Sequence, residues 1–300
     1  MVFIHTRPTD ETTLVVIQWL LFYRKDFFRL NSIADLIRWN KEQKADSCYF
    51  NGKGSIIPDV HPHDKELNEQ VRMYLQDQAD ALLLHTLPDE RKQGFGLSPF
   101  RHLRLNKLDV LSLAASIGFS VPRSAVVSSK TGLRQCKEEW GRIITKSMHE
   151  GISVNASGVL INGQRTEEIT EEVLQSMADS FFPSLVQQLI EKQFEIRVFF
   201  FRQQFYALAT FTQHNAKSLI DGRAIDIQRP NRQVPYLLPD EVRTQISTLM
   251  EKLRLDYGSL DLIYTTDNDY CFLEVNPYGQ YGFLSEAGNY GIEKEIAAYL

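Results

Sequence analysis

Residues 259–277 read S-L-D-L-I-Y-T-T-D-N-D-Y-C-F-L-E-V-N-P, and this stretch decides the fold. Two apolar runs flank a short polar segment, which predicts a β-hairpin. With the turn centred on residues 267–268, Asp261 lies directly across from Glu274, and their Cβ atoms are about 5 Å apart. Asn276 follows Glu274 by two residues and therefore projects from the same face of the hairpin.

Two carboxylates that face each other on an apolar hairpin repel, and burial increases the penalty. A positive charge should therefore compensate Asp261 and Glu274. Two carboxylates and the carboxamide of Asn276 are hard oxygen ligands, the set that Mg²⁺ shares with nucleotide phosphates. The alternative is structural: one carboxylate points to solvent, and Asn276 caps a turn before Pro277.

The composition describes an ordinary globular protein. Its 300 residues, 43% hydrophobic and 24% charged, are enough for two or three packed modules. No apolar run reaches the roughly 20 residues that span a bilayer, and the N-terminal residues show no signal-peptide pattern. We therefore expect no membrane contact. A net charge of −5 gives no general attraction to nucleic acid. The three isolated cysteines fit a reducing cytoplasm, where they act as packing residues.

Hydrophobic periodicity and turn signals predict mixed helices and strands. In the first hundred residues we expect strands at 2–6 and 27–30 and helices at 10–20 and 63–85. A boundary is expected between Leu87 and Pro99, where Pro, Gly and mixed charge accumulate. After it we expect a helix at 106–117, strands at 124–128 and 142–146, a helix at 166–181, strands at 194–201 and 205–213, a helix at 239–253 and the closing hairpin.

An Asp followed thirteen residues later by Glu-x-Asn resembles the metal-binding end of the ATP-grasp enzymes. The resemblance implies that Asp261, Glu274 and Asn276 coordinate magnesium at the phosphates of ATP. Two further motifs follow the order of that family. The N-K-L motif implies that Lys107 reaches a nucleotide phosphate, and the strand R-I-I-T-K implies the same for Lys146.

The segment V-Q-Q-L-I-E-K-Q-F-E-I-R-V resembles the hinge that holds adenine and ribose in that family. The resemblance implies adenine contacts from Gln187, Gln188, Leu189 and Ile190. It also implies that Glu195 holds the ribose hydroxyls and that Arg197 meets the γ-phosphate or the acyl phosphate. Further on, K-S-L-I-D-G-R resembles the acceptor side of the site. This resemblance implies that Lys217 and Arg223 supply basic groups and that Asp221 acts as an orienting group or base. Related ligases often have Asp-Trp-Arg where this chain has Asp-Gly-Arg.

The C-terminal sequence E-V-N-P-Y-G-Q-Y-G-F-L-S and the helix N-K-L-D-V-L-S-L-A-A-S-I-G are similar to those of graspetide ligases, the microviridin-type and grasp-with-spasm maturases. Residues 47–51 depart from the W-Y-R-R-like segment of related maturases. Residues 285–288 also differ from the corresponding segment of related maturases, which usually contains Pro-Cys. The resemblance implies an α/β (α+β) protein with the ATP-grasp fold behind an N-terminal pre-ATP-grasp domain. The implied domains are 1–104, 105–186 and 187–300.

The same resemblance implies a reaction. ATP would phosphorylate Asp or Glu side chains of a ribosomally made precursor peptide, and Thr or Ser hydroxyls or Lys amines would then displace phosphate. Pairing into homodimers is implied as well. Two alternatives stay open at this point: an ATP-grasp ligase with another acceptor, such as a protein end or a free amino acid, and a nucleotide-binding module without catalysis.

Overall fold

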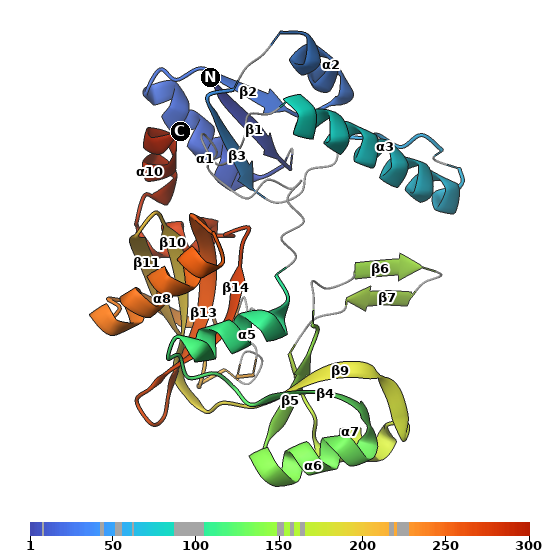
Figure 1. Cartoon of the computed structure of the whole chain (residues 1–300), viewed down its shortest axis with the longest axis vertical. Coiled ribbons are helices and arrows are strands. Elements are labelled where there is room, and N and C mark those ends of the chain that lie inside the picture. The colour runs from blue at the N-terminus through green and yellow to red at the C-terminus, as the bar shows by residue number, and fades with distance from the viewer. Residues whose placement is uncertain are drawn as a thin grey trace. The chain divides into compact units, whose positions relative to one another are not determined.

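The computed structural model describes residues 1–7, 9–42, 45–51, 56–61, 63–86, 105–148, 153–156, 159–162, 166–215, 219–220 and 228–300. The chain divides into two compact units (Figure 1). The first unit comprises Met1–Leu103, Leu255–Gly258 and Pro277–Leu300, and the second comprises Arg104–Arg254 and Ser259–Asn276. Each helix within the described ranges is too short or too polar to cross a membrane.

The first unit is built on a parallel three-stranded sheet. Its elements are β1 (Val2–Thr6), α1 (Glu11–Phe22), β2 (Phe27–Leu30), α2 (Ile33–Glu42), β3 (Ser47–Asn51), α3 (Lys65–Thr86), α9 (Gly282–Gly288) and α10 (Ile292–Tyr299). The strand order is β2-β1-β3, and all five residues of the central β1 are buried, as expected for a parallel strand covered on both faces. The ring of Phe3 lies 4.5 Å from that of Trp39 in the core.

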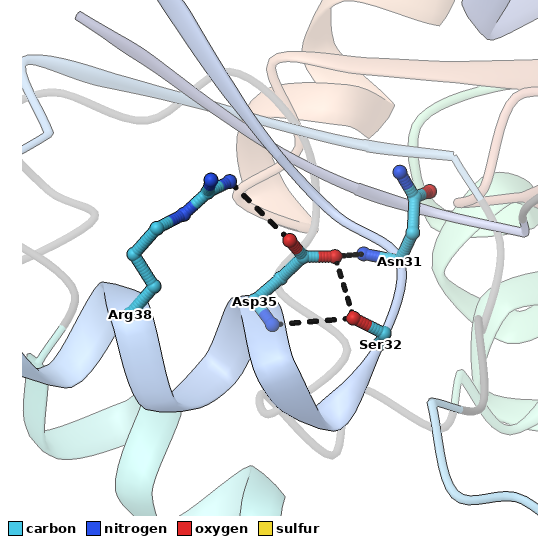
Figure 2. A network of polar contacts seen from close by, with 4 residues as sticks. All are labelled: Asn31, Ser32, Asp35 and Arg38. Atoms are coloured by element: carbon cyan, nitrogen blue, oxygen red, sulfur yellow. Dashed lines mark hydrogen bonds and ion pairs between the residues drawn. The ribbon is translucent and has the colours of Figure 1, made fainter.

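Helix α2 begins at a network of polar contacts that Figure 2 shows from close by. The Asp35 N–H donates to the Ser32 hydroxyl at 3.2 Å, and this hydroxyl donates back to the Asp35 carboxylate at 2.9 Å. The Asn31 N–H and the Arg38 guanidinium bind the same carboxylate, at 3.1 and 3.3 Å. These contacts satisfy N–H groups that have no partner within the helix. The sequence expectations omitted α2, although Ser32 and Asp35 have the spacing of a capping box.

The end of the chain packs into the first unit, where α10 lies beside α1 (Figure 1). The Tyr281 and Tyr49 hydroxyls are buried and lie 2.9 Å apart. Burial raises the pKa of both tyrosines, so both stay protonated at neutral pH. Residues 277–300 therefore belong by their contacts with the N-terminal residues in the first unit.

The second unit contains two sheets and a separate hairpin. The first sheet has the order β4-β9-β5-β8, and the second has the order β12-β11-β10-β13-β14. The elements are α5 (Lys107–Ser116), β4 (Ser124–Ser129), α6 (Lys130–Trp140), β5 (Ile143–Lys146), β6 (Ser153–Ala156), β7 (Val159–Asn162), β8 (Glu167–Glu168), α7 (Glu171–Ser176), β9 (Ser180–Gln188), β10 (Lys192–Phe201), β11 (Gln204–Phe211), β12 (Arg232–Pro235), α8 (Asp240–Lys252), β13 (Tyr257–Thr265) and β14 (Tyr270–Asn276).

The expected helix at 166–181 is wrong. The structure has the short strand β8, the six-residue helix α7 and the start of β9 in this region. Thr170 caps α7 through a bond from the Val173 N–H, which fixes a late helix start. β9 then pairs with both β4 and β5, and Pro183 lies where the β4–β9 register shifts, a place that tolerates a residue without an N–H. Tertiary pairing overrides the helical spacing of the apolar residues.

We predict that Tyr281→Phe lowers the free energy of unfolding by about 1 kcal/mol, because it removes one partner of a buried hydrogen bond and leaves the aromatic ring in place. Urea denaturation followed by circular dichroism measures this change. Tyr74→Phe is the matched control, since Tyr74 is 63% exposed, and it should change the stability by less than about 0.5 kcal/mol. Equal stabilities of the two variants would contradict the role of the tyrosine pair.

Candidate active site

Asp261 on β13 and Glu274 on β14 face each other across the antiparallel strand pair, which confirms the predicted pairing. Ser259 faces Asn276 two residues further along, so four polar side chains occupy neighbouring positions on one face. The carboxylate side chains of Asp261 and Glu274 are only 26% and 22% exposed. At this proximity and burial, their ionised forms require nearby positive charge.

The turn of this hairpin is not where the sequence expectation placed it. The Thr265 N–H donates to the Asp269 carbonyl at 2.9 Å, which leaves three residues in the loop. Asn268, the last of these residues, has a φ of 63°, the left-handed conformation that such loops use before the second strand. The turn is therefore centred on Asp267 rather than between Asp267 and Asn268.

A β-bulge compensates for this difference. Beyond the turn Leu262 faces Phe272, and the register then shifts by one residue before Asp261 faces Glu274. Leu273 is the extra residue on β14. A bulge of this kind inserts one unpaired residue and re-aims the side chains that follow it. The predicted pairing of the two acids is thus confirmed near the strand ends, but the register predicted for the half near the turn is wrong by one residue.

Arg197 on β10 compensates the negative charge of Asp261. Its Nη1 atom lies 2.8 and 2.7 Å from the two carboxylate oxygens of Asp261. The Arg197 side chain is 15% exposed, so the pair is shielded from water and its charge-assisted hydrogen bonds are strong. β10 is the neighbour of β13 in the sheet, which places the arginine directly beside the acidic pair.

Lys107 compensates the negative charge of Glu274 in the same way. Its Nζ atom lies 3.2 Å from Glu274 Oε2, and its side chain is 24% exposed. Lys107 is the first residue of α5, and the Asn106 side chain caps this helix by accepting from the Leu108 N–H at 2.9 Å. The capped start of α5 and its packing against β14 hold the lysine at the acidic pair.

Ser259 is a site residue that the sequence expectations missed. It is fully buried, and its hydroxyl has no hydrogen-bond partner in the described part of the chain. An unsatisfied buried hydroxyl destabilises a fold by about 1–3 kcal/mol, so its place beside Asn276 and Asp261 points to a group that the site accommodates. Its only sequence signal is its position two residues before Asp261.

The residues present fit a magnesium ion. Two carboxylates, a carboxamide and an adjacent hydroxyl supply oxygen donors, which Mg²⁺ prefers. No group of three or more His, Cys, Asp or Glu side chains with metal-site geometry occurs among the described residues. The cluster at Asp261 has two such acids, and Asn276 would supply a third oxygen donor, as in Mg²⁺ sites where phosphates and water provide the remaining oxygens.

Lys146 is the last residue of β5. Burial raises the pKa of the Cys271 thiol on β14 to about 12, and the Lys146 ammonium acts in the opposite direction. The Lys146 ammonium is therefore within electrostatic range of the Cys271 thiol.

Of the four expected hinge residues, Gln187 and Gln188 are the last two residues of β9, and Leu189 and Ile190 begin the connection to β10. The Gln188 and Leu189 N–H groups donate to the Arg123 and Arg142 carbonyls, each at 2.9 Å. Gln187 is 1% exposed; its side-chain amide donates to Ser124 at 2.8 Å, and its Oε1 atom is buried without a partner among the described residues. Ile190 is partly buried in the connection to β10.

Glu195 lies on β10 two residues before Arg197 and shares its face. It forms an ion pair with Lys192, whose side chain is only 7% exposed. The sequence expectations missed Lys192, since a lysine at the start of a strand ordinarily reads as a surface residue. The three expected acceptor-side residues, Lys217, Asp221 and Arg223, lie outside the described residues.

Comparisons with known proteins show which fold this chain has. No family model and no curated protein sequence matches the chain. Among solved structures, the macrocyclase MdnC of Microcystis aeruginosa MRC, bound with precursor peptide MdnA, is 24% identical with a TM-score of 0.76, over 100% of this chain and 99% of MdnC. A RiPP-associated ATP-grasp ligase of Chryseobacterium gregarium, in complex with ADP and a leader and core peptide, is 18% identical with a TM-score of 0.79, over 99% and 94%.

The ATP-grasp ligase PsnB, complexed with a minimal precursor, is 18% identical with a TM-score of 0.73, over 100% of this chain and 98% of PsnB. The chain has the ATP-grasp fold. The mixed helix and strand architecture that the resemblance implied is therefore confirmed, including its N-terminal unit, because these matches cover almost the full length of both chains. In this ATP-grasp fold the acidic pair and its two cations come from β13, β14, β10 and α5.

We predict that Lys107→Met destabilises the protein by about 1–2 kcal/mol without magnesium or nucleotide, because it leaves Glu274 partly buried without its cation. Adding Glu274→Gln should recover most of this loss, with a coupling of about 0.5–3 kcal/mol in a double-mutant cycle measured by urea denaturation. The control cycle uses Lys130→Met and Asp179→Asn. Asp179 is 99% exposed, so this coupling should stay near zero. Similar values for both cycles would contradict the pairing of Lys107 with Glu274.

Proposed function

We propose that the protein is an ATP-dependent carboxylate ligase that links side chains of a ribosomally made precursor peptide. One observation carries the proposal: on an ATP-grasp fold, Asp261 and Glu274 face each other, and each is already paired with a cation from another element. Such a cluster suits a ligand that carries both strong positive and strong negative charge. A metal–triphosphate complex is of this kind.

The formal charges of Asp261, Glu274, Arg197 and Lys107 sum to zero. A triphosphate alone would leave this site with a large net negative charge, and a bound Mg²⁺ would offset part of it. Asp261, Glu274 and Asn276 would hold Mg²⁺, and Lys107 and Arg197 would turn from the carboxylates to phosphate oxygens. When bound, Mg²⁺ neutralises phosphate charge and orients the triphosphate for transfer. We therefore expect magnesium and nucleotide to increase each other's affinity.

The chain's other residues would position the nucleotide. Lys146 adds a compact cation near β14, suited to a phosphate. The hinge residues Gln187, Gln188, Leu189 and Ile190 would contact adenine, with the buried Gln187 supporting the hinge through Ser124. Glu195 would accept hydrogen bonds from the ribose hydroxyls, and Lys192 would hold that carboxylate in its ionised form.

The reaction would run in two displacements. A substrate carboxylate oxygen attacks the γ-phosphorus, ADP leaves, and an acyl phosphate forms. A Ser or Thr hydroxyl, or a Lys amine, then attacks the acyl carbon and phosphate leaves with one former carboxylate oxygen. Arg197 would offset the charge that gathers on the transferred group. Lys217 and Arg223 would hold the acceptor side, with Asp221 as the orienting group or the base that takes the proton.

A precursor peptide is the substrate that the similar structures favour. MdnC was solved with its precursor peptide MdnA, and PsnB with a minimal precursor, Mg and ADP. The three described cysteines are free and buried, which suits a reducing cytoplasm, where ribosomal peptides are made. A ligase with another acceptor, such as a protein end or a free amino acid, is the alternative.

We predict that Glu274→Gln abolishes ADP formation and keeps the fold, because the amide has no charge to offset the metal ion. A coupled ADP assay with a precursor peptide encoded beside the enzyme measures turnover, and circular dichroism checks folding. Glu241→Gln on α8 is the matched control, an exposed glutamate away from the acidic pair, and should turn over normally. Near-normal turnover of Glu274→Gln would remove Glu274 from the metal site.

We predict that every bond formed lowers the mass of the peptide by one water molecule, since a carboxyl group condenses with a hydroxyl or an amine. Mass spectrometry of a precursor peptide co-expressed with the enzyme measures this loss. Mild alkaline hydrolysis would then distinguish esters, which are cleaved, from amides, which are not. A gain equal to an amino acid residue would support the alternative acceptor, and nucleotide binding without ADP release would support a non-catalytic module.

A further inference from the structure

Ser259 is a polar residue in a part of β13 that is otherwise apolar. Its neighbours Tyr257, Gly258 and Leu260 are all buried, and Ser259 itself is 0% exposed. Its hydroxyl finds no hydrogen-bond partner within the residues that the structure describes. An alanine would fill nearly the same volume without burying a polar group. A serine therefore costs stability here, unless a further interaction uses its hydroxyl.

The position of Ser259 in the sheet indicates which group that hydroxyl can bind. Both carboxylate oxygens of its neighbour Asp261 accept from Arg197. The residue directly across from Ser259 is Asn276. Side chains that face each other in an antiparallel strand pair have Cβ atoms about 4.5–5.5 Å apart. A hydrogen bond between a serine hydroxyl and an asparagine amide bridges this separation.

Asn276 has a restrained backbone, but the two ends of its side chain are nearly equivalent in shape. It is the last residue of β14, and Pro277 restricts the residue before it to an extended conformation. The carboxamide can still turn about its last torsion and exchange its oxygen with its NH₂ group. Only the oxygen can bind a metal ion, since the NH₂ group presents hydrogen atoms. An acceptor beside the NH₂ group would select the correct orientation.

We propose that Ser259 is a positioning residue for the magnesium ion. Its hydroxyl oxygen accepts a hydrogen bond from the Asn276 NH₂ group and thereby turns the carboxamide oxygen toward the metal. The inference rests on the magnesium site of the proposed function and adds a residue that acts through Asn276 without touching the ion. Removal of a group that orients a metal ligand typically weakens metal binding by roughly 10–100-fold.

This role predicts two effects of opposite sign for Ser259→Ala. Without metal and nucleotide, the variant should be more stable than the wild type, because it removes a buried hydroxyl that has no partner in that state. With both ligands, it should bind magnesium more weakly, because the Asn276 carboxamide is no longer held in one orientation. A residue that serves only folding would not combine a gain in stability with a loss of metal affinity.

The magnesium requirement of nucleotide binding tests the proposal without any turnover. Isothermal titration calorimetry with the non-hydrolysable analogue AMPPNP gives the Mg²⁺ concentration at which the analogue is half-bound. We expect Ser259→Ala to raise this concentration by about tenfold or more. Urea denaturation of the same variant, without ligands, should show a higher midpoint than the wild type.

Thr265→Val is the matched control. Thr265 is a second buried hydroxyl on β13, and it accepts a hydrogen bond from the Asp269 N–H at 3.1 Å. Because this hydroxyl already has a partner, its removal should lower the urea midpoint. The Mg²⁺ requirement of this variant should equal that of the wild type. Circular dichroism checks that each variant is folded.

A second background tests whether Ser259 acts through the carboxamide. A carboxylate presents an oxygen whichever way it turns, so the Asn276→Asp variant needs no selection between two ends. In this background Ser259→Ala should lose most of its effect on the Mg²⁺ requirement, which a double-mutant cycle measures as a coupling between the two positions.

Three results would overturn the proposal and leave the ligase function standing. They are a wild-type Mg²⁺ requirement in Ser259→Ala, a lower urea midpoint in that variant, and an equal loss of Mg²⁺ affinity in the Asn276 and Asn276→Asp backgrounds. A different result would reach further. If the wild type bound AMPPNP equally well with and without Mg²⁺, the metal site itself would fall, together with the proposed function.

Discussion

The repulsion between two opposed carboxylates is the constraint on which the rest of the site depends. Asp261 and Glu274 are adjacent and largely shielded from water, so neither is stable in its charged form without a cation. Arg197 comes from the neighbouring strand β10, and Lys107 comes from the first turn of α5. Both elements must therefore be in place for the acidic hairpin to reach its full stability. The same cations are suited to phosphate, so in the function that we propose one set of charges would serve both stability and ligand binding.

Small backbone features place these charges. The bulge at Leu273 and the left-handed Asn268 together decide which residue of β14 faces Asp261. The Asn106 cap decides where α5 begins and hence where Lys107 emerges. Each feature involves one or two residues and a local change of backbone geometry, yet each sets a contact between elements that are far apart in the sequence.

The first unit holds the C-terminal segment of the chain. The chain leaves the second unit at Asn276, a site residue, and enters the first unit at Pro277. The buried Tyr49–Tyr281 pair then fixes the C-terminal segment beside the N-terminal strands. Helix α1 packs against α10, while its residues Leu21 and Phe22 are exposed.

The sequence by itself determined the hairpin and the short strands and helices whose periodicity is local, such as β1, β2 and α3. These features depend on neighbours in the chain, so local patterns suffice to predict them. The tertiary structure alone decided the rest. It replaced the expected helix at 166–181 with α7 and β9, because pairing with β4 and β5 outweighs helical spacing. It also moved the turn, formed the bulge, buried Ser259 and joined residues 277–300 to the first unit. All of these depend on contacts between distant segments, whose free energies no local pattern contains.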